Sequence, residues 1–281
     1  MNTFATNLKN RRLELGMSQD ELAQKLGYKT RSSINKIEKG INDVPRKKVD
    51  EFADALQTTP AALLGWDESK AQSAQTINHD FCLETLAKRL RQNEYDVEVF
   101  ANSKEVANYL IRRCKNKTVG LSDSITITQM KLYEKLSEIY GENVIASEER
   151  ISISKESLNK AITSDVFILS ISAIAYDTGE MVNIGNVGYS IAGSLCDSGE
   201  IIIIANKNKI TPNLEGAIYR ARNVSATTAT KNYGYRTPCT KTGKCENCDS
   251  SDRYCRLMCI YYRKPKLSHV TVVLLDQNTN Y

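Results

Sequence analysis

Apolar residues in the first quarter of the chain recur every three or four positions, the spacing that places side chains on one face of an α-helix. This spacing predicts four amphipathic helices and a short fifth helix. Their inward-facing residues are Phe4, Leu8 and Leu15, then Leu22, Ala23 and Leu26, then Ile34 and Ile37, then Val49, Phe52, Ala53 and Leu56, with a last turn from Pro60 to Leu64. Gly16, Gly27 and Gly40 end helices, and Ser18 with Glu21 forms a capping box at the start of the second helix.

From Phe81 onward, helical patterns alternate with short apolar runs that predict strands at 96–100, 118–121, 166–171, 201–205 and 270–275. Continuous apolar runs are typical of parallel strands that helices cover on both faces. Residues 67–80 have the composition of a linker. The pattern therefore predicts two domains: an all-α domain of five helices in residues 1–66 and an α/β domain with a mainly parallel sheet in residues 81–281. Ligands of such sheets bind at the carboxyl ends of the strands.

The 281 residues carry a formal net charge of +5. No apolar run approaches the ~20 residues of a membrane helix, and the first residues lack the apolar core of a signal peptide, so we expect a cytoplasmic protein with no membrane partner. Several cations cluster in the first domain: Arg11, Arg12, Lys29, Arg31, Lys36, Lys39, Arg46, Lys47 and Lys48. A phosphate backbone favours such clusters, and a merely solvated face is the alternative.

Two short helices joined by a glycine turn have the geometry that places the second helix in a major groove of DNA. The sequences SQDELAQKLG and SSINKIEKG resemble the Xre-like (lambda-repressor-like) helix-turn-helix repressors. This resemblance implies double-stranded DNA as a partner, with Gln19 on a phosphate and the second helix on bases. The predicted DNA-binding residues are Gln19, Thr30, Arg31, Ser32, Asn35 and Lys36. A helical bundle used only for protein contacts is the alternative.

Four stretches of the second domain resemble the LUD (lactate utilisation) domain family. They are VGLSDSITITQMKLYEKL, AYDTGEMVNIGNVGYSIAG, IIIIANKNKITPNLEGAIYRAR and RTPCTKTGKCENCDSSDRYC. The resemblance implies an α/β fold related to ribose-phosphate isomerase and CoA-transferase-like proteins. The ligand-binding residues predicted from it are Ser124, Asp177, Gly179, Asn183, Gly188, Asn208 and Lys209. A simple turn between strands is the alternative for Asp177, Gly179 and Asn183.

Several positions depart from the pattern of that family. Ser122 and Asp123 stand where the family has two glycines, and added side chains would hinder the approach of backbone amides to an anion. Gly185, Tyr189 and Ser190 stand where the family has an aspartate, an asparagine and an arginine. These losses remove groups that could fix a polar substrate, so we expect no enzymatic activity.

The cysteines of the last stretch match every cysteine of the family pattern: Cys239, Cys245, Cys248 and Cys255, with Cys259 in addition. Four thiolates at this spacing can hold zinc or an iron–sulfur cluster. A redox-active thiol set is the competing interpretation, because Lys241, Lys244 and Arg253 lie near enough in sequence to lower the pKa of a thiol. Cysteines that only pack are the third.

Together these features predict a sequence-specific, DNA-binding transcriptional regulator. Its second domain would sense a small-molecule effector or a redox or metal state. We expect a homodimer, because one helix-turn-helix module buries little surface and operators of this class are usually two-fold. The alternative is a lactate-utilisation-type enzyme that carries an accessory DNA-binding domain.

Overall fold

The computed structural model describes residues 3–42, 44, 45, 48–64, 81–146, 155–195 and 199–277. The chain divides into two compact units, residues 1–73 and 74–281. The predicted linker, residues 67–80, lies outside the described residues. Within the described parts of the chain, no helix has the length and apolar character needed to cross a membrane.

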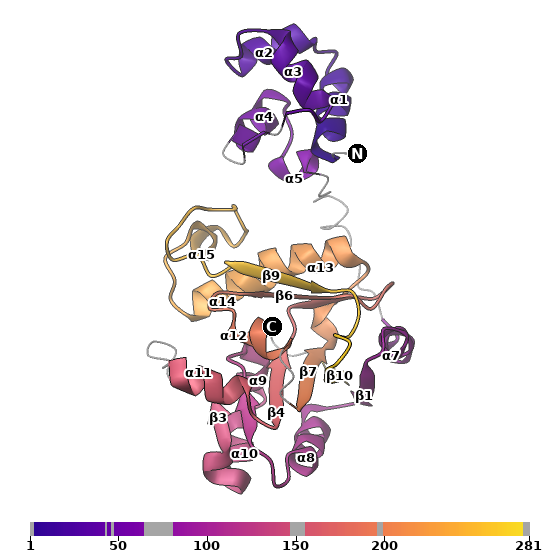
Figure 1. The fold of residues 1–281 in the computed structure, drawn as a ribbon, viewed down its shortest axis with the longest axis vertical. Helices are drawn as coiled ribbons and strands as arrows, with labels where there is room; N and C mark the ends of the chain where they lie inside the picture. The colour runs from indigo at the N-terminus through magenta and orange to yellow at the C-terminus, as the bar shows by residue number, and fades with distance from the viewer. Residues whose placement is uncertain are drawn as a thin grey trace. The chain divides into compact units, whose positions relative to one another are not determined.

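The first unit consists of short helices, as the hydrophobic spacing predicts (Figure 1). They are α1 (Thr3–Glu14), α2 (Gln19–Lys25), α3 (Arg31–Glu38), α4 (Val49–Ala55) and α5 (Pro60–Leu63). Ser18 and Glu21 form the predicted capping box, in which the Ser18 hydroxyl accepts the Glu21 N–H at 3.1 Å and the Glu21 carboxylate accepts the Ser18 N–H at 2.6 Å. Gly27, with a φ of 70°, makes the turn between α2 and α3.

The core of the first unit contains the residues that the helical spacing assigns to the inner faces. Its buried members are Leu8, Leu22, Ala23, Ile34, Ile37, Phe52, Ala53, Leu56 and Leu63. The ring of Phe52 lies 6.1 Å from the rings of both Phe4 and Tyr28, measured between centroids. Helices α1, α2, α3 and α4 thus share one small core, which fixes the orientation of α3 within the unit.

The second unit is built around a sheet of six parallel strands in the order β1-β10-β7-β4-β2-β3. The strands are β1 (Asp96–Phe100), β2 (Val119–Leu121), β3 (Val144–Ala146), β4 (Val166–Ser170), β7 (Glu200–Asn206) and β10 (His269–Leu275). The parallel sheet and the five predicted strands are confirmed. Strand β3, at one edge, is an addition that the sequence does not predict.

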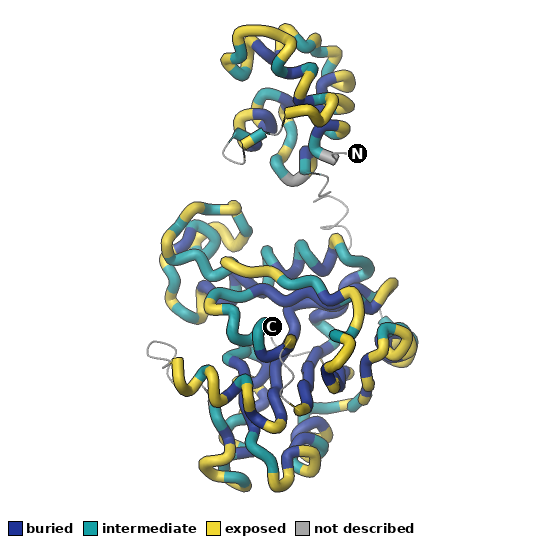
Figure 2. The backbone as a smooth tube through the Cα atoms, viewed as in Figure 1, coloured by how far each residue is buried: buried dark blue, intermediate teal, exposed yellow. Residues whose placement is uncertain are grey.

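Each apolar run divides its side chains between the two faces of this sheet, and Figure 2 shows that these strands are buried. In β4, Val166 and Ile168 pack with one helical layer, whereas Phe167 and Leu169 pack with the other. The layer that packs with Val166 and Ile168 contains α8 (Ser103–Arg113), α9 (Ile125–Gln129) and α10 (Leu132–Tyr140), and η2 (Gly141–Asn143) follows α10. The opposite layer contains α7 (Leu83–Gln92) and α11 (Lys155–Ile162). Both faces are therefore buried, as continuous apolar strands require.

A second, mixed sheet joins the parallel one, and its strands β6 and β9 run across β4 and β7 in Figure 1. Its order is β8 (Ile210–Thr211), β5 (Ala173–Ala175), β6 (Met181–Gly185) and β9 (Leu257–Tyr261). The sequence does not predict this sheet, because runs of two to five residues carry too little periodicity. Its far face packs on α13 (Leu214–Arg220), the π-helical turn η4 (Ala221–Ser225) and α14 (Ala226–Asn232).

Among the described residues, three further short segments are α12 (Tyr189–Gly193) after β6, η3 (Lys207–Lys209) after β7, and α15 (Pro238–Thr242), which contains Cys239. Segment η3 leaves a strand of the parallel sheet at its carboxyl end, where such a sheet offers a site for a ligand, whereas α12 follows a strand of the mixed sheet. The mixed sheet and η4 face the same region, so this end of the domain is enclosed from several sides.

Candidate DNA-binding face and ligand cleft

Helix α3 presents its polar residues to solvent. Thr30 is its N-cap residue, and Thr30, Arg31, Ser32 and Lys36 are exposed, whereas Asn35 is half-buried. The Arg31 guanidinium lies 3.9 Å from the Asp20 carboxylate, and both side chains are more than two-thirds exposed, so this pair contributes little to stability. The predicted base-reading residues therefore share one accessible row on the second helix of the motif.

Gln19 begins α2 and is held by a buried ion pair. Its amide Nε2 donates to Glu38 Oε2 at 2.7 Å, and the same carboxylate accepts Arg12 Nε at 2.5 Å and Arg12 Nη2 at 3.2 Å. The side chains of Arg12 and Glu38 are 8% and 3% exposed. Helices α1, α2 and α3 are thereby cross-linked, and the Gln19 amide is fixed at the entrance of α2.

Two cations of the predicted basic cluster serve the fold instead of facing solvent. Arg12 is buried in the pair with Glu38, and Arg11 donates from Nε and Nη2 to the carbonyl oxygens of Leu56 and Gln57. The sequence expectation that Arg12 belongs to a phosphate-binding patch is wrong for this reason, whereas for Arg11, whose side chain is 34% exposed, it stays a prediction. Arg46 and Lys47 lie outside the described residues, and Lys48 Nζ lies 4.9 Å from the centroid of the Tyr28 ring.

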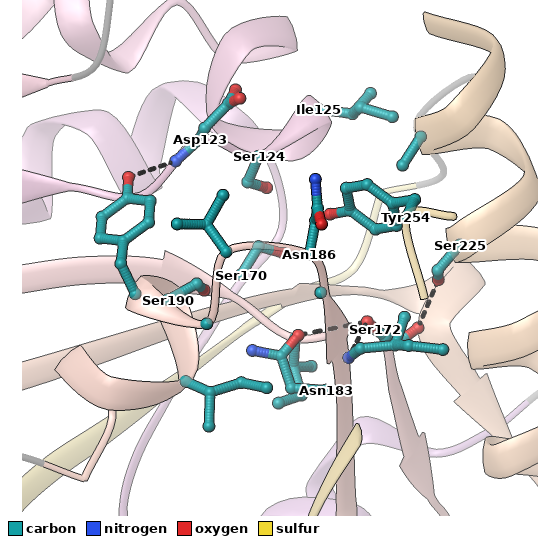
Figure 3. Close-up of a pocket in the computed structure, with 18 of the residues that line it drawn as sticks. Asp123, Ser124, Ile125, Ser170, Ser172, Asn183, Asn186, Ser190, Ser225 and Tyr254 are labelled. Atoms are coloured by element: carbon teal, nitrogen blue, oxygen red, sulfur yellow. Dashed lines mark hydrogen bonds between the residues drawn. The ribbon is translucent and has the colours of Figure 1, made fainter. Parts of the chain in front are cut away.

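The second unit contains a cleft of about 980 Å³, including space open to solvent, at the carboxyl ends of β2 and β4 (Figure 3). The segment after β2 forms one wall, the end of β6 and the start of α12 form another, and η4 and α14 form a third. We call this the ligand cleft. It lies where a parallel sheet is expected to bind ligands.

Lys209 lines the floor of the ligand cleft and Arg220 lies beneath it, and the two residues are 2% and 4% exposed. Lys209 Nζ donates to Ser170 Oγ at 2.5 Å and to the Ile171 carbonyl at 2.7 Å. Arg220 Nη1 donates to the carbonyl of Ser172, which lines the cleft. Burial, and then the charge of Arg220, hold the pKa of Lys209 well below its usual value. Arg220 therefore places a buried positive charge beneath the floor, and burial disfavours the charged form of Lys209.

Asn183 provides a further polar group on the wall of the ligand cleft. Its Oδ1 accepts the Ser172 hydroxyl at 3.2 Å, while its buried Nδ2 has no partner at normal hydrogen-bond geometry among the described residues, although Asn183 lies near enough to Tyr261 to lower the pKa of that hydroxyl. Figure 3 shows the amide nitrogen directed away from Ser172. Because a buried amide nitrogen without a partner is costly, a ligand oxygen in the cleft would gain by accepting this N–H.

The Tyr189 hydroxyl bonds the segment around Asp123, where the family pattern has a glycine loop. Its hydroxyl accepts the Asp123 N–H at 2.8 Å and donates to the Leu121 carbonyl at 3.0 Å. The backbone amide that a glycine loop could offer to an anion is thus bonded within the protein. The two departures from the family pattern, at Asp123 and Tyr189, are structurally coupled.

Three tyrosines close the side of the ligand cleft opposite α12. The rings of Tyr233 and Tyr254 stack with centroids 5.7 Å apart, and Tyr235 lies 6.2 Å from each of them. Asn186 Nδ2 donates to the Tyr235 hydroxyl at 2.8 Å, which joins this wall to the end of β6. These rings are 109 or more residues from Ser124 in sequence, so no local motif could have assigned them to the same site.

Four of the seven predicted ligand residues line the cleft together: Ser124, Asn183, Gly188 and Lys209. The other three do not line it. Asp177 and Gly179 belong to the turn between β5 and β6, where Gly179 packs on α7, and the Asn208 carbonyl accepts Arg220 Nε. The sequence missed the three tyrosines, as well as Ser170, Ser172 and Ser225.

The cysteines divide into a close pair and separate members. The Cys255 thiol donates a hydrogen bond to Cys245, and this bond, followed by the charge of Arg222, lowers the pKa of Cys245 despite its burial. The same bond raises the pKa of Cys255. Cys239 instead lies 3.0 Å from the Thr237 hydroxyl.

In the described part of the chain, no group of three or more potential ligands is placed to hold a metal ion, and the predicted zinc or iron–sulfur centre stays a prediction.

Replacing Lys209 with methionine should alter the pH dependence of stability. Because its folded-state pKa is lowered, the folded protein binds fewer protons than the unfolded chain, so Lys209 makes the free energy of unfolding rise with pH until about pH 10, the pKa of an unfolded lysine. Denaturant titrations between about pH 7 and pH 10 should show this rise in the wild type and a weaker one in Lys209→Met. Lys207→Met, which removes the surface pair with Asp276, is the matched control. If the free energy of unfolding rose equally with pH in all three proteins, the lowered pKa of Lys209 would be contradicted.

Two family models match the chain, one in each unit. The LUD domain model matches residues 83–275, and a helix-turn-helix model matches residues 8–63. Among solved structures, a DUF162 family protein from Deinococcus radiodurans has 12% identity and a TM-score of 0.40, covering 69% of this chain and 95% of that one. An HTH_3 family transcriptional regulator from Vibrio cholerae has 21% identity and a TM-score of 0.23, covering 30% and 52%. No curated protein matches. The chain therefore belongs to the LUD domain family and carries an Xre-like helix-turn-helix domain ahead of its LUD domain.

Proposed function

We propose that this protein is a sequence-specific transcriptional regulator whose LUD domain binds a small metabolite as effector. The observation that carries the proposal is the exposed row on α3, held in place by the buried Arg12–Glu38 pair. A cross-linked three-helix support keeps the reading helix rigid, which sequence-specific recognition requires.

On DNA, α3 enters the major groove with Arg31, Ser32 and Lys36 toward the base edges. Arginine and lysine donate to guanine, and serine can pair with several bases. Gln19, at the start of α2 and oriented by Glu38, contacts a phosphate. The protein binds as a homodimer, because a single module buries only about 600–1,000 Å² on DNA.

The effector binds in the ligand cleft. The cleft is lined by four serine hydroxyl groups, those of Ser124, Ser170, Ser172 and Ser225. Arg220 lies beneath its floor. These groups suit a small molecule with several oxygen atoms and a negative charge, and the tyrosine wall can cover its apolar side. The family relationship suggests a hydroxy acid or oxo acid of the lactate type as the first candidate.

Arg31→Ala and Lys36→Ala should each weaken binding to the preferred DNA sequence by ~1–3 kcal/mol and relax sequence preference, because each removes a base contact. Gln19→Ala should weaken all sequences about equally, since a phosphate contact carries no sequence information. Fluorescence anisotropy with DNA selected from a random library measures both effects. Lys9→Ala on α1 removes the same charge elsewhere and should have the smaller effect. Failure of the full chain to bind any DNA at low salt would refute the DNA-binding role.

Lactate or pyruvate should raise the thermal midpoint of the full chain if the ligand cleft is the effector site, because binding to the folded state adds stability as ligand concentration rises. Asn183→Leu should abolish this rise by removing a polar group of the cleft wall. Asp177→Ala, in the turn outside the cleft, should retain it. An unchanged midpoint with both acids would exclude them as effectors, and equal responses of the two variants would place the site elsewhere.

One observation favours an enzyme as the second candidate. The Lys209 amine lies 2.5 Å from the Ser170 hydroxyl in a cleft, a pairing that could move a proton to or from a substrate. The regulator proposal expects no turnover when full-length protein is incubated with lactate and a dye that accepts electrons. Turnover that Lys209→Met abolishes and Lys207→Met retains would favour the enzyme instead.

A further inference from the structure

The ligand cleft has two chemically different parts. Its floor presents buried polar groups, namely the hydroxyls of Ser170, Ser172 and Ser225 and the side-chain amide of Asn183. One of its sides is the tyrosine wall, formed by the half-buried rings of Tyr233, Tyr235 and Tyr254. We propose that the cleft takes an aromatic hydroxy acid or oxo acid, with its carboxylate end on the floor and its ring against the tyrosine wall. This inference rests on the proposed function and narrows its effector to one chemical class.

One helical face connects the floor to the tyrosine wall. Ser225, Ala229 and Tyr233 all line the cleft and follow one another at intervals of four residues, from the end of η4 to the C-cap of α14. Residues four apart lie on the same face of a helix, and each such step rises ~6 Å. The lining therefore changes from a hydroxyl to a methyl group to an aromatic ring over roughly 12 Å.

A three-carbon acid such as lactate is too short to use this whole length, because its C–C bonds are only ~1.5 Å long. The volume of the cleft, about 980 Å³ with space open to solvent, lies at the upper end of the ~300–1,000 Å³ that holds drug-sized ligands. Ala229, between the two parts, contributes only a methyl group and leaves room for a chain to pass. A ring on the third carbon would bring the acid to the tyrosines.

The charges around the cleft place the carboxylate on the floor. Arg220 Nη1 donates to the Ser172 carbonyl and to Ser225 Oγ at 2.9 Å, so its positive charge lies directly beneath the serines. Asp123 is the acidic side chain among the described lining residues, and it belongs to the wall after β2. Figure 3 shows its carboxylate directed away from Ser172 and Asn183. An anion on the floor therefore meets hydroxyl and amide donors without facing that carboxylate.

The tyrosine wall is arranged to receive a ring. Tyr233 and Tyr254 stack with their planes 29° apart, and the ring of Tyr235 is inclined to them by 79° and 51°. Aromatic rings pair favourably through faces and edges, and the wall offers both. The hydrogen bond from Asn186 Nδ2 to the Tyr235 hydroxyl, 2.8 Å long, holds the wall to the end of β6 before any ligand binds. Such preorganisation lowers the entropic cost of binding.

The test compares two acids that differ by one phenyl group. Isothermal titration calorimetry of the full chain with racemic lactate and with racemic 3-phenyllactate gives a Kd for each. We expect a Kd about ten- to hundredfold lower for phenyllactate, because its ring is buried against the tyrosine wall. 3-Phenyl-1,2-propanediol, which has a hydroxymethyl group in place of the carboxylate, should bind more weakly than phenyllactate. These comparisons use the wild-type protein and need no variant to fold.

Variants then assign the two ends of the ligand. Tyr254→Leu should raise the Kd for phenyllactate by about threefold to tenfold and leave the Kd for lactate unchanged, since it removes one ring of the wall. Asn183→Leu should weaken both acids, because both place their oxygens on the floor. Tyr262→Leu is the matched control, since Tyr262 is 63% exposed and does not line the cleft. Circular dichroism of each variant verifies that it is folded.

Binding of lactate without tighter binding of phenyllactate would overturn the inference and leave the proposed function standing. No binding of phenyllactate, or equal losses in Tyr254→Leu and Tyr262→Leu, would overturn it as well. Binding of phenyllactate in the cleft by a chain that binds no DNA would refute the regulator instead, and the ligand class would stand.

Discussion

The parallel pairing of β7 with β4 on one side and β10 on the other is the constraint on which the LUD domain depends. The apolar residues of β7 are at most 1% exposed, because alternate side chains fill the two opposite faces of the sheet. A strand in this position cannot slip by one residue without exchanging both sets of contacts. Its register therefore fixes where the chain leaves the sheet, and Lys209 lies only three residues beyond that point.

The ligand cleft follows from this register. Ser170, at the end of β4, accepts a hydrogen bond from the Lys209 amine, and Arg220 reaches the carbonyl of Ser172 from α13. Burying two cations side by side is unfavourable, and the domain accommodates them through hydrogen bonds to carbonyl and hydroxyl oxygens and through a lowered pKa of Lys209. A ligand with negative charge would offset the buried charge of Arg220, which ties the energetics of the fold to the proposed binding of an effector.

Buried ionic contacts play a comparable part in the helix-turn-helix domain. A domain of this size has a small core, and Arg12 with Glu38 supplies directional bonds between α1 and α3 that apolar packing lacks. Loss of one partner would leave the other charge buried without compensation. The pair also positions Gln19, so the geometry of a proposed phosphate contact depends on a residue in a different helix.

The sequence by itself determined the two domains, the helix-turn-helix motif, the capping box at Ser18 and the parallel strands, because these depend on local periodicity and on short-range hydrogen bonds. It also identified Ser124, Asn183, Gly188 and Lys209, which share the cleft. Only the tertiary structure decided the rest. The mixed sheet as a whole, the tyrosine wall, the proximity of Cys245 to Cys255 and the pairing of Arg12 with Glu38 depend on segments that are separated in the sequence, and no local pattern specifies which distant groups meet. Burial likewise decided that Arg12 supports the fold, since charge in the sequence does not reveal which cations face solvent.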